Sequence, residues 1–409
     1  MNLRFSAEPS ISERACSTAD EALALSAVPS IVVIGDLVEG WPPRQGRGLD
    51  VEEAERYWRE APVEQCFGPV GDPIAARETL AVVGGYLERL PLACVSAGLV
   101  DHAEIWHHWR GEGPGPFRRD GQLLARRAFR IDEEGAPFAS SDMLGFLRAH
   151  GAPHILVVLG LGVDEAVLRA CGRSFKIYNS IDAPALRVPP EVSRHFDLVL
   201  TGAEWQSEAV RARHPDMATE IMPIGPEFAD PETFRPLGTA KDYDLVYVAA
   251  AQGYKRHDIL FDALERLPRS IRALCVFGYG EMAEDLKRQA DERGLSVDVV
   301  GPPGVPFAEV NALMNRARIG LVCGVDDGAP AIITEYMLAG LPVLANERLS
   351  CGLQFITPET GRTAPAEGFA DAITDMLADL DRFRPREISL ERWVWPHTVA
   401  RLTASVGPT

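Results

Sequence analysis

The most informative stretch of this 409-residue chain is Val325-Asp-Asp-Gly-Ala-Pro-Ala-Ile-Ile-Thr-Glu-Tyr-Met-Leu-Ala-Gly-Leu-Pro-Val343. It follows an apolar run, Ile319–Cys323, that predicts a buried strand. Gly328-Ala-Pro330 predicts a turn, and Pro330 suits the first turn of the helix that it starts. The start of that helix would present free N–H groups and the positive end of the helix dipole, which favour an anionic group such as a diphosphate.

Two carboxylates flank the start of this predicted helix. Asp327 lies in the turn, and seven residues separate it from Glu335. Both would repel a phosphate that they touched, so we expect them to hold hydroxyl groups, one on a sugar and one on a ribose. The alternative is a solvated turn acid and a surface helix acid, since acid pairs at this spacing are common.

Apolar strands alternate with amphipathic helices on both sides of this stretch. The alternation runs over residues 141–223 and again over residues 244–380, and it predicts parallel sheets covered by helices. Between the two series, residues 223–236 contain four prolines, which is typical of a linker. Two α/β halves would place a ligand cleft between them, at the carboxyl ends of the strands.

The first 140 residues are less regular. We expect a buried strand over Ser30–Gly35, a helix over Ala75–Leu90, and strands over Leu92–Leu99 and Glu104–Trp109.

Composition excludes several classes of protein. The chain is 46% hydrophobic and 24% charged, as in soluble globular proteins, and its length predicts two or three domains. Its net charge of −18 disfavours nucleic acid or anionic lipid as the main partner. The run Ile155–Val163 is too short to span a bilayer, and Pro29 interrupts the apolar N-terminal run, which disfavours a signal peptide. We therefore expect a cytoplasmic protein without an integral membrane segment.

The cysteines and lysines add to this interpretation. The seven cysteines are odd in number, scattered and never in a CxxC pair, so we expect reduced thiols that pack in the interior. Only four of the 41 basic residues are lysines, which makes Lys255 more informative than usual. On its own, Lys255 would more often be a solvated charge at the start of the helix predicted over Arg256–Leu267.

From about residue 150 onward the chain resembles retaining GT-B glycosyltransferases of the glycosyltransferase-4, or glycosyl transferases group 1, kind. The donor-site motif of that family has an acid and a glutamate with seven residues between them, in the context Asp-Gly-x-Pro…Glu-x-Met-x-Ala-Gly-x-Pro-Val, and Asp327 to Val343 matches it. Three further segments agree. Phe196–Trp205 with Pro223–Gly225 is similar to the end of the family's first domain, and Tyr254–Leu264 is similar to the Lys-Gly motif of its second domain. Arg392–Trp395 resembles the family's C-terminal helix.

The resemblance implies an α/β protein with the GT-B fold, in which two Rossmann-like domains place parallel sheets across a cleft. We expect an acceptor-side domain over residues 1–235, a donor-binding domain over residues 236–390, and a helix over residues 391–409 that crosses back to the first domain. The implied enzyme is a hexosyltransferase that moves a sugar, with retention, from a nucleotide diphosphate sugar to an unidentified and soluble acceptor. The oligomeric state stays open.

The resemblance also assigns roles by position. Glu335 would bind the ribose hydroxyls, Asp327 would contact the donor sugar, and Lys255 would stabilise the diphosphate leaving group. The other implied donor-side residues are Gly328, Ala329, Pro330, Thr334, Arg256, Val300 and Gly301. We expect no cofactor beyond the nucleotide-sugar co-substrate, and no metal, because Lys255 and the helix N-terminus would neutralise the diphosphate and the chain has no Asp-x-Asp motif.

Several positions depart from the family pattern. Ala250 stands where the family usually has an arginine, and Arg256, the candidate substitute, stands where it has a glycine. Asp327 is shorter than the commoner glutamate. Gly160-Leu-Gly162 stands where the family often has a histidine. These departures keep open two alternatives: a catalytically weak GT-B protein that binds a sugar nucleotide or a protein partner, and a GT-B epimerase or hydrolase.

The acceptor-side candidates are less specific. Asp182 follows the strand predicted over Phe175–Asn179 and would contact an acceptor or cap a turn. Gly160 lies in a glycine turn that lacks the third glycine of a dinucleotide loop. His107 and His108 are adjacent on a predicted strand and would point to opposite faces, so a packed aromatic segment is the alternative to a role in acceptor binding.

Overall fold

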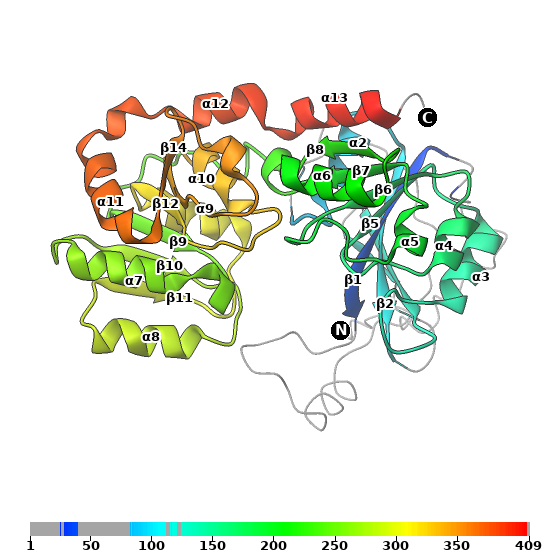
Figure 1. The fold of residues 1–409 in the computed structure, drawn as a ribbon, viewed down its shortest axis with the longest axis horizontal. Coiled ribbons are helices and arrows are strands. Elements are labelled where there is room, and N and C mark those ends of the chain that lie inside the picture. The colour runs from blue at the N-terminus through cyan, green and yellow to red at the C-terminus, as the bar shows by residue number, and fades with distance from the viewer. Residues whose placement is uncertain are drawn as a thin grey trace, which may run out of the picture.

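A computed structural model describes residues 25, 28–39, 82, 84–111, 115, 117–120 and 124–406. Figure 1 shows two α/β lobes side by side, with the two C-terminal helices lying along both of them. In the described part of the chain, the first lobe is built on an eight-stranded sheet and the second on a six-stranded sheet. Most of the helix predicted over Ala75–Leu90 lies outside the described residues.

The first sheet has the strand order β3-β4-β2-β1-β5-β6-β7-β8. All neighbours pair in parallel except β3, an antiparallel edge strand beside β4. The strands are β1 (Ser30–Glu39), β2 (His102–Trp109), β3 (Phe117–Asp120), β4 (Leu124–Arg130), β5 (Ile155–Leu159), β6 (Phe175–Asn179), β7 (Leu198–Thr201) and β8 (Ala218–Ile221). The chain leaves β1 towards β2 on one side and returns to β5 on the other, so the strand order reverses beside β1.

Helices cover both faces of this sheet. They are α2 (Arg89–Ser96), α3 (Ser141–His150), α4 (Glu165–Ala170), α5 (Pro190–Ser193) and α6 (Glu204–Arg213). Successive residues of β1 face opposite sides: Val33 packs in the core that includes α2, and Val32 in the core that includes α3 and α4. Ser140 caps α3, because its hydroxyl accepts a hydrogen bond from Met143 N–H at 3.1 Å.

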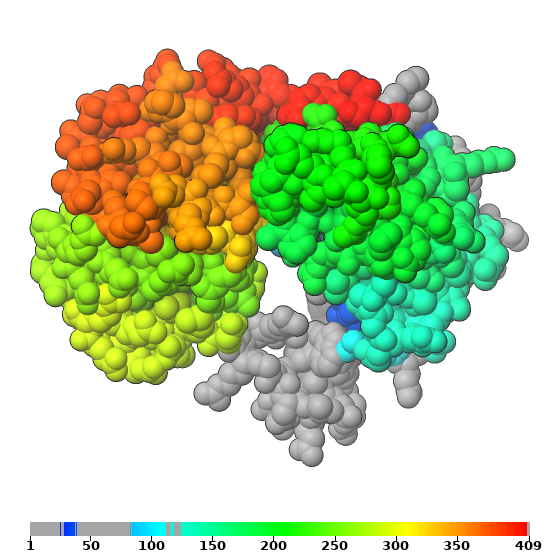
Figure 2. All heavy atoms as spheres, in the orientation of Figure 1, coloured from blue at the N-terminus to red at the C-terminus, as the bar shows by residue number. Residues whose placement is uncertain are grey.

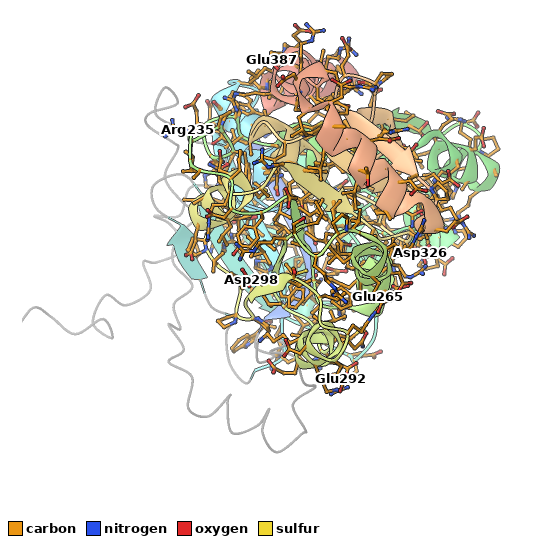
Figure 3. All side chains as sticks on the ribbon, turned by 90° about the vertical axis from the view of Figure 1, so that its left-hand side faces the viewer. Arg235, Glu265, Glu292, Asp298, Asp326 and Glu387 are labelled. Atoms are coloured by element: carbon orange, nitrogen blue, oxygen red, sulfur yellow. The ribbon has the colours of Figure 1, made fainter. Side chains whose placement is uncertain are left out.

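The second sheet is wholly parallel in its described strands and has the order β11-β10-β9-β12-β13-β14. The strands are β9 (Leu245–Val248), β10 (Ala273–Val276), β11 (Val297–Val300), β12 (Ile319–Val322), β13 (Val343–Asn346) and β14 (Gly361–Ala364). The helices are α7 (His257–Arg266), α8 (Ala283–Glu292), α9 (Phe307–Asn315), α10 (Ile332–Leu338) and α11 (Phe369–Ala378). Its strand order reverses between β9 and β12. Figure 3, in which this lobe faces the viewer, shows charged side chains such as Glu265 and Glu292 on the outside of α7 and α8.

The C-terminal helices connect the two lobes. Helix α12 (Pro385–Arg392) packs on α10 of the second lobe, and α13 (Trp395–Val406) packs on α2 of the first. Val394 still belongs to the core of the second lobe, whereas Leu402 belongs to that of the first. The domain boundaries at residues 235 and 390 stay predictions. Among the described residues, no helix is both long enough and apolar enough to cross a bilayer.

Some expectations about single elements are wrong. Leu92–Leu99 is not a strand, since Arg89–Ser96 forms helix α2. This helix is buried on every side from Arg89 to Val95, so its sequence reads as an unbroken apolar run without a 3.6-residue period. The sequence analysis did not predict strands β3, β4 and β14. Strand β4 carries three arginines and β14 is four residues long, so these two strands show no apolar alternation.

A buried polar network lies in the first sheet around Glu104 of β2. Its carboxylate accepts hydrogen bonds from Arg127 Nε and Trp106 Nε1, each at 2.8 Å, and His102 Nε2 lies 3.2 Å away. Burial alone would raise the pKa of Glu104, but the charge of Arg127 and the contact with His102 outweigh it and hold that pKa at about 2. The network therefore depends on an ionised carboxylate in the core.

Replacing Glu104 with glutamine should destabilise the protein. The neutral amide would remove the buried carboxylate that pairs with Arg127, and breaking a buried pair in this way costs about 3–5 kcal/mol. Urea unfolding at pH 7 measures this change in the free energy of unfolding. The matched control is Glu134→Gln, because Glu134 pairs with Arg110 at the surface and its side chain is 70% exposed.

The same variant tests the pH dependence of stability. The pKa of Glu104 is about 2 in the folded protein against an ordinary value of 4.5, so its contribution is complete above pH 4.5 and is lost as the pH falls towards 2. The wild type should therefore lose about 3 kcal/mol more than Glu104→Gln over this range. If both proteins lost the same free energy of unfolding between pH 4.5 and pH 2, a lowered pKa of Glu104 would be contradicted.

Candidate functional site

A cavity of about 880 Å³ lies between the two lobes. The first lobe contributes Asp36, Tyr86, Asp182 and Arg187 to its lining, and the second contributes Lys255, Tyr254, Tyr279 and residues 326–332. The lobes meet along a furrow in the space-filling view of Figure 2.

The cavity lies where strands of both sheets end. Asp36 belongs to the last part of β1 and Asp182 follows β6, while Tyr279 follows β10 and Asp327 follows β12. In each sheet the cavity lies beside the strand where the order reverses, β1 in the first and the pair β9 and β12 in the second. Open α/β sheets bind ligands at such reversal points, outside the carboxyl ends of their strands.

Lys255 and Asp327, two of the predicted donor-side residues, form an ion pair. Both side chains are less than one-fifth exposed, and the Lys255 ammonium also lies 4.8 Å from the centre of the Tyr254 ring. The other oxygen of Asp327 accepts from Ala329 N–H at 3.3 Å, which fixes the turn before α10. Its neighbour Asp326 is exposed at the surface in Figure 3. The structure thus places one cation and one anion together at the cavity wall.

Glu335 occupies a different environment from Asp327. It lies in α10, about one turn beyond Ala331 and Ile332, which line the cavity. Its carboxylate is buried and forms an ion pair with Arg89 of α2, in the first lobe. The predicted ribose-binding carboxylate is therefore already engaged by a cation from the opposite lobe.

The turn that carries Gly328 touches the first lobe. A side chain at Gly328 would overlap the backbone of Asp182, and one at Gly202 would overlap the carbonyl oxygen of Gly328. Only glycine allows such close approach of two backbones. Of the predicted donor-side residues, Gly328, Ala329 and Pro330 all line the cavity.

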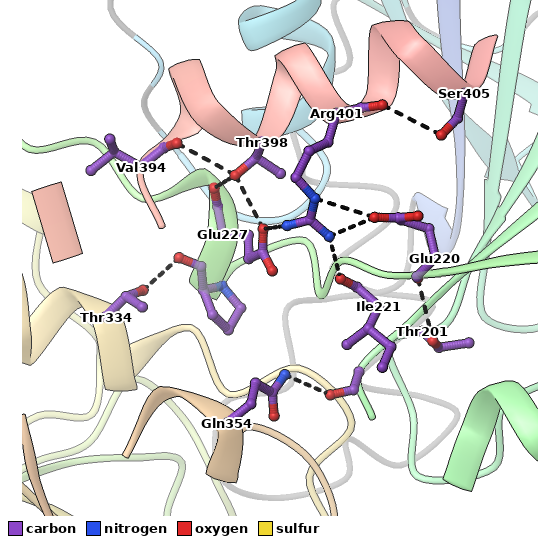
Figure 4. A network of polar contacts seen from close by, with 12 residues as sticks. Thr201, Glu220, Ile221, Glu227, Thr334, Gln354, Val394, Thr398, Arg401 and Ser405 are labelled. Carbon is purple, nitrogen blue, oxygen red and sulfur yellow. Dashed lines mark hydrogen bonds and ion pairs between the residues drawn. The ribbon is translucent and has the colours of Figure 1, made fainter. Parts of the chain in front are cut away.

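Hydrogen bonds join the two lobes beside this turn and hold the C-terminal helix on the first lobe (Figure 4). Thr334 of α10 donates to Pro226 O at 2.7 Å, and Gln354 donates to Gly202 O at 2.9 Å. Arg401 of α13 bonds both Glu220 and Glu227, the latter at 2.7 Å. The structure therefore assigns Thr334 a contact between the lobes, and not a place in the cavity lining.

Three other predicted donor-side residues lie away from the cavity lining. Arg256 has a left-handed backbone (φ 52°), and its guanidinium bonds Asp258 at 2.7 Å, so it does not fill the place left open by Ala250, which lines the cavity. Val300 and Gly301 lie at the end of β11 and are not among the lining residues.

The acceptor-side candidates divide into two groups. Asp182 lines the cavity and lies 3.2 Å from Arg187, and Gly160 lies so close to Asp36 that a side chain there would overlap the Asp36 carboxylate. His107 and His108 are buried in β2 and neither lines the cavity. The ring of His108 packs on Phe138, 4.4 Å between ring centres, and burial lowers its pKa to about 4. These two histidines therefore pack inside the sheet, and their role in acceptor binding stays a prediction.

Three residues of the first lobe that line the cavity, and Arg89 beside them, were not predicted from the sequence or had no role there. Burial, followed by the nearby charge of Asp182, raises the pKa of Asp36, and burial raises that of Tyr86 to about 12. Arg187 lines both this cavity and a second one of about 380 Å³ on the first lobe. Arg89 anchors Glu335. A signal existed only for Asp36, a charged residue directly after an apolar strand.

Comparison with known proteins gives one family and one curated relative. Residues 230–386 match the family Glycosyl transferases group 1. The chain is also 28% identical over 165 residues to the GDP-mannose-dependent alpha-(1-6)-phosphatidylinositol monomannoside mannosyltransferase of Mycolicibacterium smegmatis. This similarity covers 36% of this chain and 43% of that protein, so the chain matches less than half the length of this relative.

Solved structures resemble nearly the whole chain. Sucrose-phosphate synthase from Thermosynechococcus elongatus superposes with a TM-score of 0.59 at 17% identity, over 92% of this chain and 97% of that one. HepE of Anabaena, solved with UDP and glucose, has a TM-score of 0.60 at 14% identity, over 92% and 99%. At such identities the likeness shows the fold alone, and it confirms the predicted GT-B fold of two lobes with facing sheets. The family match therefore covers the segment that carries the Lys255–Asp327 pair.

Proposed function

We propose that the chain is a glycosyltransferase that moves a sugar from a nucleotide diphosphate sugar to an acceptor, with retention of configuration. The observation that carries this proposal is the Lys255–Asp327 ion pair on the wall of a cavity between two sheets, within the segment that matches the family. The cavity, of about 880 Å³, has the size of a small-molecule site.

The cavity residues fit the charges of such a reaction. When the bond from the anomeric carbon to the diphosphate breaks, negative charge develops on the departing phosphate oxygen, and Lys255 would stabilise it. The acceptor hydroxyl would form the new bond from the same face, and its proton would pass to the departing phosphate. Asp327 would hold a hydroxyl group of the donor sugar. Retention is supported by the resemblance of Asp327–Val343 to the family's donor motif.

The first lobe would hold the acceptor. Asp36, Asp182 and Arg187 face the cavity from the side opposite Lys255 and Asp327. The acceptor is proposed to be soluble, the base and sugar stay open, and no metal or other cofactor is invoked. UDP and GDP are the first nucleoside diphosphates to test, because HepE was solved with UDP and the mycobacterial relative is named for GDP-mannose.

A second candidate is a catalytically weak protein that binds a sugar nucleotide. It is favoured by the orientation of Arg256, which bonds Asp258 and leaves the position of Ala250 without a cation. Turnover and affinity distinguish the two candidates, because a protein that only binds its ligand loses affinity and has no turnover to lose.

A nucleoside diphosphate should raise the melting temperature. A ligand at 100 times its dissociation constant stabilises a protein by about 2.7 kcal/mol. We expect one of UDP, GDP, ADP, TDP and CDP to do so selectively in a thermal-shift assay, and Glu335→Ala to lose the effect. Stabilisation by none of the five would contradict a donor site in this cavity.

Replacing Asp327 with asparagine should lower kcat by about 100-fold or more, since it removes a charged partner that acts at the reacting sugar. The affinity for the selected nucleoside diphosphate should change by only a few-fold. Steady-state kinetics and calorimetry measure the two quantities. The matched control is Asp371→Asn, an exposed acid of α11 that does not line the cavity, which should stay within a few-fold of the wild type in both. Equal losses in the two variants would contradict a specific role for Asp327.

Replacing Gly328 with alanine should weaken binding of the selected nucleoside diphosphate by about tenfold or more. The added methyl group would overlap the backbone of Asp182 and push the turn before α10 out of place, and displacing a binding group by even 1 Å can have large effects. Calorimetry measures the affinity. Gly145→Ala is the control, because it lies in α3 with room for a methyl group, and it should bind normally.

A further inference from the structure

We propose that Arg89, from the first lobe, is a positioning residue for nucleotide recognition. It would hold the Glu335 carboxylate across the interface between the lobes, so that recognition of the ribose hydroxyls requires the two lobes to be in the arrangement seen here. This inference rests on the proposed function, because it takes Glu335 as the residue that meets the ribose.

Arg89 is bound by three separate parts of the chain. Its Nε donates to Gly84 O at 2.8 Å, one terminal nitrogen donates to Gly225 O at 2.7 Å, and the other forms the ion pair with Glu335. Gly84 begins the loop before α2, Gly225 lies in the linker between the lobes, and Glu335 lies in α10 of the second lobe. Only the fork of an arginine can reach three acceptors in these directions.

The second lobe also encloses the guanidinium with aromatic rings. Arg89 is 2% exposed, and its guanidinium carbon lies 5.9 Å from the centre of the Phe234 ring and 6.0 Å from that of Phe307. An isolated charge is unfavourable in such a place, so its burial depends on Glu335 and the two carbonyl groups. If the lobes separated, both Arg89 and Glu335 would lose their partner at once.

The ion pair leaves part of Glu335 for a ligand. Oε1 of Glu335 takes the bond from Arg89, and Oε2 accepts no hydrogen bond from any of the described residues. A carboxylate fixed through one oxygen presents the other in a defined direction, which favours a hydroxyl donor through pre-organisation. Ribose hydroxyls fit this requirement, because a nucleotide with its diphosphate at Lys255 would extend along the wall where Ala331 and Ile332 lead to Glu335.

The same cation connects this carboxylate to the rest of the cleft. The loop that Arg89 holds at Gly84 carries Tyr86, which lines the cavity from the first lobe. The linker that it holds at Gly225 has a backbone (φ 130°) that favours glycine. Ribose recognition, the Tyr86 loop and the linker therefore share one buried arginine, and a ligand that stabilises one of them should stabilise the others.

The test compares ribose with ribose lacking its hydroxyls. Calorimetry would give the affinities of the wild type for UDP and GDP and for their 2′,3′-dideoxy analogues. The wild type should bind the natural form of its preferred diphosphate at least about tenfold more tightly than the dideoxy analogue, since only the natural form can donate a hydrogen bond to the Glu335 carboxylate. Arg89→Met removes the anchor of Glu335, and its two affinities should agree within about twofold.

Two further variants separate positioning from general cohesion of the lobes. Trp205→Phe removes another bond between the lobes, from Trp205 Nε1 to Ser350 O at 2.7 Å, and it should keep the wild-type discrimination. Arg89→Lys keeps the charge but cannot reach three partners, so it should lose most of the discrimination even if Arg89→Met does not fold.

The outcomes are distinguishable. A folded Arg89→Met, or failing that Arg89→Lys, that still discriminates as the wild type does would overturn the inference and leave the proposed function intact. Loss of discrimination in Trp205→Phe as well would also overturn it, because any contact between the lobes would then suffice. A wild type that binds no nucleoside diphosphate would instead overturn the proposed function.

Discussion

The ion pair between Arg89 and Glu335 is the contact on which the cleft depends. Each residue comes from a different lobe, both are buried, and neither charge is tolerable there without the other. Around the pair, Gly328 touches the backbone of Asp182, and Thr334 bonds Pro226. The cavity owes its two-sided lining to this meeting of the lobes, since its cations and acids come from both. The wall that carries Lys255 and the wall that carries Asp36 face one another only in this arrangement.

Electrostatics inside the cavity set a condition on any anionic ligand. Among the described lining residues, the acids Asp36, Asp182, Asp326 and Asp327 outnumber the cations Lys255 and Arg187. Each cation is already paired, Lys255 with Asp327 and Arg187 with Asp182. A diphosphate must therefore compete with an aspartate for Lys255, and a sugar whose hydroxyls satisfy Asp327 would release the ammonium. Binding of the sugar and of the diphosphate would thus assist each other, which is an advantage for a transferase over a simple nucleotide binder.

The sequence predicted the second lobe better than the first, for physical reasons. A turn with Gly and Pro, flanked by strand and helix patterns, specified Asp327 and its neighbours, and the position of Lys255 followed from the start of α7. The direction of a side chain is harder to predict: Arg256 turns away because its backbone is left-handed, and Thr334 faces the other lobe because of its phase on α10. The contact made by Arg89 could not be predicted, because the helix that carries it is buried on every side and shows no polar face. Contacts between distant segments, such as Arg89 with Glu335, have no local signal.

A crystal structure of the protein with its preferred nucleoside diphosphate is the most direct measurement. We expect the diphosphate beside Lys255, the ribose hydroxyls at Oε2 of Glu335, and Arg89 still bound to Oε1 with the lobes in contact. A nucleotide bound elsewhere, or one that displaces Arg89 and separates the lobes, would contradict a donor site built by the meeting of the two lobes.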